Sequence, residues 1–140
     1  MVDAAVLVRE HLLNQPEVTS LLGTNLNQSI YAAADLPEHF NPKLGPAIQV
    51  WRSGGTSHGE ITQLVNAHVQ IRVWADVEKY QLASDVYSAI NDTLHGVTGV
   101  RLDDGTIMSA LEATGPQEIT DPDTAWVTIN SIYAVMARPN

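Results

Sequence analysis

The sequence predicts a single α+β domain over residues 1–140, built on a mainly antiparallel sheet with helices packed on one of its faces. The length of 140 residues corresponds to about one domain. The segment Ala67–Ala75 alternates strictly between apolar and polar residues, which is typical of a strand with one buried face. Asp103-Asp104-Gly105 separates two further apolar segments and is a hairpin signal. Hairpin links and alternating polarity favour an antiparallel sheet over a series of βαβ units.

The N-terminal segment is predicted to be helical. A helix is expected over Asp3–Leu13, with its first residue as the N-cap, and Pro16 is suited to start a second short helix that Gly23 ends. Ser29–Ala32 then favours a short strand. Ala33–Pro46 contains three prolines, so we expect a long loop there.

Four further segments are expected to form strands of the sheet or to end them. Ala47–Arg52 is predicted as a strand, and Ser53–Gly59 is rich in turn residues that would end it. Glu60–Val65 either extends the strand at Ala67–Ala75 backwards or pairs with it. The final strand is predicted over Ala125–Met136, with alternate apolar residues on one face.

A long amphipathic helix is predicted over Val77–His95, with Asp76 as its N-cap and Gly96 as its end. Acidic residues seven positions apart share one solvent-facing edge of this helix; they are Glu78, Asp85 and Asp92. The apolar residues follow the i, i+3, i+4, i+7 rule and are expected to pack on the sheet; they are Ala83, Val86, Tyr87, Ile90 and Leu94.

A hairpin is predicted after the helix, with arms over Val97–Leu102 and Thr106–Thr114. We expect a type I′ turn between the arms, in which Gly105 adopts a positive φ. Gly115-Pro116 and Asp121-Pro122-Asp123 contain turn residues that favour a further loop before the last strand.

The composition excludes several classes of protein. Sixteen acidic against seven basic residues give a formal net charge of −9, the opposite of what a protein that grips nucleic-acid phosphates needs. The chain has no cysteine, which excludes disulfides, thiolate metal sites and a cysteine nucleophile. The N-terminus carries no basic leader and the apolar runs are short, so we expect a soluble protein with no membrane partner.

Two motifs resemble enzyme signatures and are incomplete. Gly55-Thr56-Ser57-His58-Gly59 matches the nucleophile elbow of hydrolases, but a strand-like segment follows it where a helix is required. His58-Gly59-Glu60 matches half of a zinc deaminase signature whose other half needs cysteines. We therefore expect no enzyme, no metal and no cofactor. A small enzyme or ligand-binding domain that uses Glu60 and histidines from separate segments stays as an alternative; the histidines are His11, His39, His58, His68 and His95.

The tryptophans Trp51, Trp74 and Trp126 each lie in a predicted strand. Alternation places Trp74 and Trp126 on the more polar face of the sheet, away from the expected core. Aromatic residues are enriched at the centres of protein interfaces, so packing in the core or at a subunit contact is the expected role.

A resemblance to a known family is carried by four stretches of the sequence. They are Pro16–Gly23, Ile30-Tyr31 with the proline-bearing loop after it, Gly45–Val50 leading to Gly54-Gly55, and His68–Ala75 followed by Tyr80–Val86. Together these stretches resemble the small tail-terminator or tail-completion proteins of long-tailed bacteriophages, which join the tail to the head. The resemblance brings no catalytic residue with it.

The resemblance implies a structural protein of the virion. In that family an α+β subunit assembles into a ring, typically a hexamer, that caps the tail tube at the neck. The implied partners are further copies of the chain, the tail tube protein and a head connector or stopper protein, with assembly in the host cytoplasm. DNA would pass through the ring without specific binding, because an acidic ring repels it. Another ring component of the neck, a stopper or an adaptor, is the nearest alternative.

Contacts with neighbouring subunits are expected in the irregular segments Ala33–Pro46 and Ser53–Gly59 and on the tryptophan-bearing face of the sheet. The residues expected to make these contacts are Pro37, Phe40, Pro42, Pro46, Gly54, Gly55, His58, Trp74 and Trp126.

Overall fold

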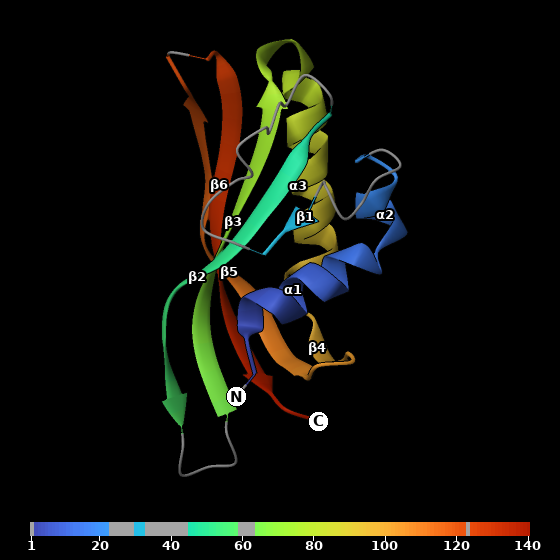
Figure 1. Cartoon of the computed structure of the whole chain (residues 1–140), viewed down its shortest axis with the longest axis vertical. Helices are drawn as coiled ribbons and strands as arrows, with labels where there is room; N and C mark the ends of the chain where they lie inside the picture. Colours follow the sequence, from blue (N-terminus) through green and yellow to red (C-terminus); the bar gives the residue numbers. More distant parts are fainter. Residues whose placement is uncertain (1, 23–29, 33–44, 59–63, 123) are drawn as a thin grey trace.

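The sheet and its helices form the two layers of the predicted α+β fold. The computed structural model describes residues 2–22, 30–32, 45–58, 64–122 and 124–140, and within this part the side chains of residues 55–58 are left undescribed. In the described residues a six-stranded sheet has the order β1-β2-β3-β6-β5-β4. Only the β1–β2 pair is parallel, and the other pairs are antiparallel. Figure 1 shows the helices on one side of this sheet. The predicted fold class is confirmed.

The elements follow one another in nearly the predicted order. The helices are α1 (Ala4–Leu13), α2 (Pro16–Thr19) and α3 (Tyr80–Leu94), the last preceded by a 3₁₀ turn at Val77–Lys79. The strands are β1 (Ile30–Tyr31), β2 (Ala47–His58), β3 (Leu64–Asp76), β4 (Thr98–Arg101), β5 (Thr106–Thr120) and β6 (Trp126–Arg138). The predicted loop at Ala33–Pro46 lies outside the described residues except for its end at 45–46.

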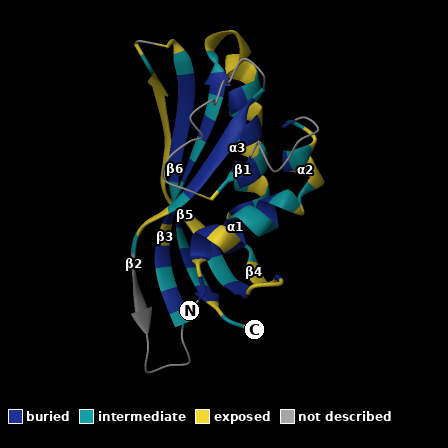
Figure 2. Ribbon diagram, in the orientation of Figure 1, coloured by how far each residue is buried: buried dark blue, intermediate teal, exposed yellow. Residues whose placement is uncertain are grey.

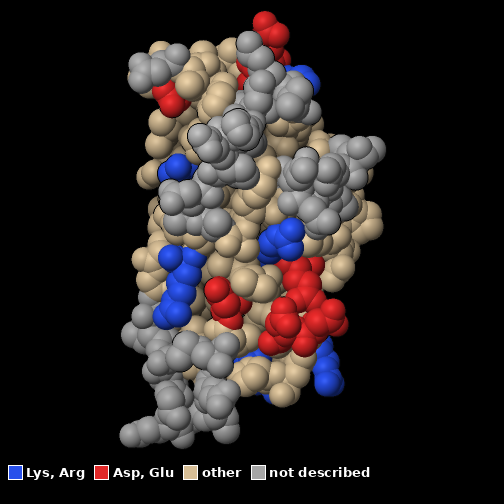
Figure 3. Space-filling view, viewed as in Figure 1, with Lys and Arg blue, Asp and Glu red and all other residues tan. Residues whose placement is uncertain are grey.

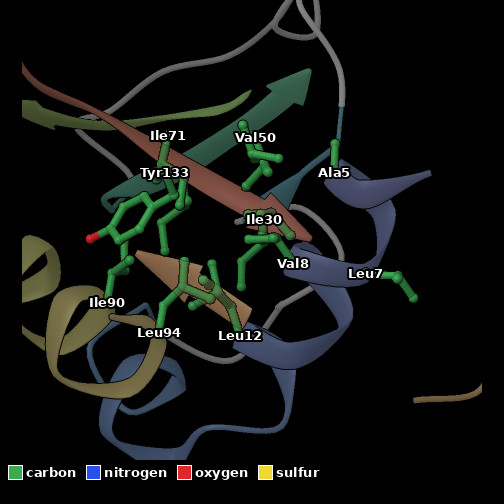
Figure 4. Close-up of a cluster of buried hydrophobic side chains, with 14 of the residues drawn as sticks. Ala5, Leu7, Val8, Leu12, Ile30, Val50, Ile71, Ile90, Leu94 and Tyr133 are labelled. Atoms are coloured by element: carbon green, nitrogen blue, oxygen red, sulfur yellow. The ribbon is translucent and has the colours of Figure 1, made fainter. Parts of the chain in front are cut away.

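The core lies between the helices and one face of the sheet. Along β3 the alternation of apolar and polar residues becomes an alternation of buried and more exposed positions (Figure 2). Side chains from α1, α3 and strands β1, β2, β3 and β6 meet in one cluster, which includes Leu7, Leu12, Ile71, Ile90 and Tyr133 (Figure 4). Register pairs from β3 and β6, such as Val73 with Ile129, share this inner face.

Both predicted N-caps are present. The side chain of Asp3 accepts hydrogen bonds from the backbone N–H groups of Ala5 and Val6, at 2.9 and 3.4 Å, and so satisfies the first turn of α1. Asp76 Oδ1 accepts from the N–H of Glu78 at 3.4 Å. The first residues after Asp76 form the 3₁₀ turn instead of the expected α-helical turn. The apolar stripe of α3 is buried as predicted, with Tyr87 partly exposed.

Two strands are longer than predicted, because pairing with a neighbouring strand overrides turn-forming residues. β2 continues through the glycine-rich segment to His58, with a register shift between Arg52 and Gly54 and partners on β3 as far as Leu64. β5 continues through Gly115-Pro116 to Thr120, with an irregularity that contains these two residues. β4 pairs with β5 only from Thr106 to Ser109, so in the described structure β5 is an edge strand at Pro116. No neighbouring strand needs an N–H donor from β5 at that position, and proline is tolerated.

The hairpin between β4 and β5 is confirmed, but Gly105 is needed for a different reason from the predicted one. Its φ is not positive; the described glycines with positive φ are Gly45, Gly96 and Gly99. A Cβ atom at Gly105 would lie 2.6 Å from Val2 Cγ2 and 2.9 Å from the carbonyl oxygen of Arg138. Glycine is therefore required by the close approach of the chain termini and not by the turn geometry.

Candidate interaction surface

The second face of the sheet is not covered by any helix that the structure describes (Figure 1). We call it the open face. The strand register assigns to it the alternate residues of the four long strands. These include Ala47, Gln49 and Trp51 of β2, Asn66, His68, Gln70, Arg72, Trp74 and Asp76 of β3, Trp126, Thr128, Asn130, Ile132, Ala134 and Met136 of β6, and Ser109, Leu111, Thr114, Gln117 and Ile119 of β5. No described helix packs on this face, and Gln49, Thr128 and Asn130 on it are buried while its tryptophans are half-buried.

An aromatic cluster around an arginine occupies one end of the open face. The Arg72 guanidinium carbon lies 5.2 Å from the ring centroid of Trp51 and 5.5 Å from that of Trp74, so the cation stacks between two indoles. Trp74 and Trp126 meet edge to face with centroids 6.1 Å apart. The indole N–H of Trp74 donates to Gln49 Oε1 at 3.0 Å, which fixes the ring orientation.

Arg72 carries its charge without a described acidic partner. Its Nε donates to the side-chain oxygen of Asn130, and Asn130 in turn donates to Thr128 Oγ1 at 3.2 Å. Burial lowers the pKa of Arg72 from its usual range, and the group remains charged at neutral pH. Among the described residues no carboxylate pairs with it. The neutral amide and the two indoles therefore hold the guanidinium in place.

The other end of the open face is hollowed and apolar. A cavity of about 300 Å³ lies over β3, β6 and β5, where the small side chains of Ser109 and Ala134 leave room between longer neighbours. Its other open-face lining residues are Asn66, His68, Leu111 and Met136. Leu111 is 53% exposed, and so is Ile119, which lies at the aromatic end of the face because it pairs with Thr128. This end of the face is therefore a hollow with apolar lining residues.

Acidic residues are concentrated away from the open face. Its described positions include one acid, Asp76, at a corner beside Trp126. The carboxylates of β5, Glu112 and Glu118, accept hydrogen bonds from tyrosines on the helix side. Acidic side chains also gather over α1 and β4 (Figure 3). The two sides of the subunit therefore differ in charge.

A tyrosine–carboxylate network ties α3 to the sheet. Glu112 Oε2 accepts from the hydroxyls of Tyr87 and Tyr133, and the Tyr133 hydroxyl also lies 3.0 Å from Asn91 Oδ1. His95 Nδ1 accepts the backbone N–H of Glu112 at 2.9 Å. Burial and the nearby Glu112 charge raise the pKa of Tyr133, and burial and the hydrogen bond to Glu112 raise the pKa of Tyr87. These contacts fix the helix on β5 and β6.

The enzyme-like motifs do not form a reaction centre in the described structure. Ser57 lies within β2 and pairs with Val65 of β3, so it is not at the strand-to-helix turn that a nucleophile elbow requires. Among the described residues no group of three or more His, Cys, Asp or Glu side chains is placed to hold a metal. Glu60 and His39 lie outside the described residues.

The structure brings together part of the predicted contact set. Trp74 and Trp126 are half-buried neighbours on the open face, as the alternation predicts. Gly54 is half-buried within β2, and Gly55 and His58 belong to the same strand. Pro46 is buried just before β2, and its contact with a neighbouring subunit stays a prediction. The remaining predicted contact residues, Pro37, Phe40 and Pro42, lie outside the described residues.

Sequence reasoning missed Arg72 and Asn130, and it named Trp51 without placing it among the expected contact residues. Each was in a predicted strand, but the stacking of Arg72 depends on the register of three strands. The alternation of β3 does place Arg72 and Trp74 on one face, and this signal could have identified the arginine.

The fold and the open face define a small α+β protein whose main described surface feature is suited to protein contact. None of the described helices has both the length and the apolar character needed to cross a membrane. Residues 6–136 match the family described as tail completion protein gp17. The chain therefore belongs to this family, as the resemblance predicted, and is a structural protein of a phage tail.

A similar fold occurs in a solved virion structure. A chain in the virion of a native gene transfer agent particle matches with a TM-score of 0.68 and 14% sequence identity, over 96% of this chain and 94% of that chain. At this identity the match supports the fold. No curated protein matches this chain in sequence.

Proposed function

We propose that the protein is a tail terminator subunit, which forms a ring that caps the finished tail tube and joins the tail to the neck of the head. The observation that carries the proposal is the open face, which no described helix covers, with its tryptophans and hollow, in a chain of the tail completion family. A subunit that acts alone gains nothing from leaving such a face exposed, whereas a ring subunit buries it against a neighbour.

A ring is favoured by the asymmetry of the subunit. The open face lies on one side of the sheet and the helices lie on the other (Figure 1). A contact between two such different surfaces is head-to-tail, and a head-to-tail contact closes into a ring when the rotation allows it. A hexamer is the ring size that the family resemblance implies. The partners on the two sides of the ring would be the tail tube protein and a head connector or stopper protein.

The charge of the chain suits a channel for DNA. With a net charge of −9 the ring would repel phosphates and let DNA slide through without specific contacts. The role needs neither catalysis nor a cofactor. The similar chain from the gene transfer agent particle is itself part of a virion, which supports a place in the particle for this chain.

The experiment that tests the function removes the gene from the phage and supplies it again from a plasmid. Without the chain, we expect free filled heads and tails that are not joined, with tubes of irregular length. Complementation should restore joined particles. Normal, joined particles in the absence of the chain would refute the proposal. Particles that stay joined but have tubes of irregular length would favour a different neck component.

A further inference from the structure

The terminal nitrogens of Arg72 have no described acceptor, although the group is held rigidly on the open face. Among the described residues its Nε donates to the side chain of Asn130, and the two indoles lie 5.2 and 5.5 Å from its guanidinium carbon. An arginine held this way keeps donors in a fixed planar arrangement that matches a carboxylate. The burial that lowers its pKa also reduces the cost of desolvating it in an interface.

A carboxylate source exists on the opposite side of the same chain. The outward residues of α3 recur at i, i+4, i+7 and i+11, and Glu78 precedes them on the same side. We call this set the outer stripe; its members are Glu78, Gln81, Asp85, Ser88 and Asp92. All of them are exposed. Three are acidic and none is basic, and Gln81 Nε2 donates to Asp85 Oδ1 at 2.9 Å, which orients that carboxylate. The stripe is therefore a narrow acidic ridge with a small residue, Ser88, at its centre.

We propose that the open face of one copy of this chain binds the outer stripe of α3 of the next copy, and that Arg72 receives a carboxylate from this stripe. The inference rests on the proposed ring. It assigns the contact by charge complementarity: the open face carries Arg72 with one acid at its corner, and every charged residue of the stripe is acidic.

A face-to-face pairing of two open faces fits the charges less well. Such a pairing relates two identical surfaces, and the one acid among the described open-face residues, Asp76, lies at a corner, so the pairing offers Arg72 fewer carboxylates than the outer stripe does. The head-to-tail contact satisfies the Arg72 donors. Because the open face and α3 lie on opposite sides of the sheet, each copy offers both surfaces at once, and the contact can continue around a ring.

The tryptophans explain why Arg72 would be central to this contact. Tryptophan and arginine dominate the energetics of protein interfaces, and they act best in pockets from which water is excluded. Trp51 and Trp74 flank the guanidinium, and Trp126 extends the apolar surface beside it. A helix that docks here would exclude water from the charge pair on both sides.

Cross-linking between single cysteines tests the contact, since the natural chain has no cysteine. Two differently tagged variants, Gln70→Cys on the open face and Ser88→Cys on the outer stripe, are produced together during particle assembly. A short bismaleimide is then added to the purified particles. We expect mixed dimers that carry both tags. A Gln70→Cys dimer with one kind of tag would show face-to-face packing, and rings without the mixed product would also overturn the inference.

Substitution of Arg72 supplies a second measurement. Arg72→Gln should reduce the yield of joined particles by at least about tenfold, because the neutral amide cannot pair with the acid. Arg101→Gln is the matched control, since Arg101 is exposed at the end of β4 and away from the open face. Thermal melting of each purified variant checks that the subunit stays folded. A folded Arg72→Gln protein that assembles like the natural chain would contradict the proposal.

The two proposals fail in different ways. If the chain forms rings in particles but the mixed cross-link is missing, the terminator function stands and the contact is wrong. If the chain is missing from particles, the terminator function is wrong. The same cross-linking on the concentrated free protein then tests the contact: a mixed dimer supports it, and a Gln70→Cys dimer with one kind of tag contradicts it.

Discussion

Substitution of Gly105 by alanine tests the packing of the N-terminus against the hairpin between β4 and β5. An alanine Cβ would lie 2.6 Å from Val2 Cγ2, 2.9 Å from the Arg138 carbonyl oxygen and 3.2 Å from Leu7 Cδ1. The Val2 side chain can rotate away, but the carbonyl belongs to the backbone of β6 and Leu7 is fully buried. Neither has room to move without disturbing the core.

The expected cost follows from this crowding. Adding a methyl group to a packed site costs about 1–3 kcal/mol when the neighbours must shift. We expect Gly105→Ala to lower the free energy of unfolding by this amount, measured by urea denaturation followed by far-ultraviolet circular dichroism. The midpoint should fall while the slope with urea stays the same, because the surface exposed on unfolding hardly changes.

Gly54→Ala is the matched control for this prediction. No heavy atom lies within 4 Å of a Cβ built at Gly54, and its φ is not in the positive region. Its substitution should leave stability unchanged or raise it by up to ~1 kcal/mol, because alanine has less backbone freedom to lose on folding. Equal effects of the two substitutions, or a neutral Gly105→Ala, would refute the claim that close approach explains the glycine.

Three further predictions concern stability. Ile90→Ala should cost about 2–5 kcal/mol in urea unfolding because Ile90 is fully buried in the α3 stripe, and a loss below ~0.5 kcal/mol would show that the stripe is wrongly placed. The pKa of Tyr133 is raised in the folded state, so the folded protein keeps the hydroxyl proton that the unfolded chain loses near pH 10. The stability that Tyr133 contributes in this way is complete below pH 10 and is lost as pH rises further. Unfolding free energy should therefore fall above pH 10, by up to ~1.4 kcal/mol per pH unit from this group, and Tyr133→Phe should flatten the fall; an equally steep fall in the variant would contradict the assignment. Ala125 has a φ of +60° in the hairpin between β5 and β6, so Ala125→Gly should raise stability by about 0.5–1 kcal/mol in the same assay, whereas a loss would show that the turn is different.

Local patterns predicted the elements whose sequence and environment agree. The strict alternation of β3 and the apolar stripe of α3 each depend on one buried face, so the period alone identifies them. The ends of β2 and β5 could not be read in the same way. Ser53–Gly55 and Gly115-Pro116 contain turn residues, but pairing with β3 and β6 holds them in strands.

The candidate site was predicted only in outline. Alternation placed Trp74 and Trp126 on the second face of the sheet, and the structure confirms this placement. The stacking of Arg72 on Trp51 required the register between β2 and β3, which depends on long-range pairing and has no local signal. The role of Gly105 was misjudged for a similar reason, since the atoms that crowd it come from distant parts of the chain.

The most direct test of the proposed function is cryo-electron microscopy of purified particles. The account predicts that this chain forms a closed ring between the top of the tail tube and the head connector. Within that ring, the open face of each copy should be covered by α3 of its neighbour. A chain found only at the distal tip of the tail, or not found in the particles, would contradict the account.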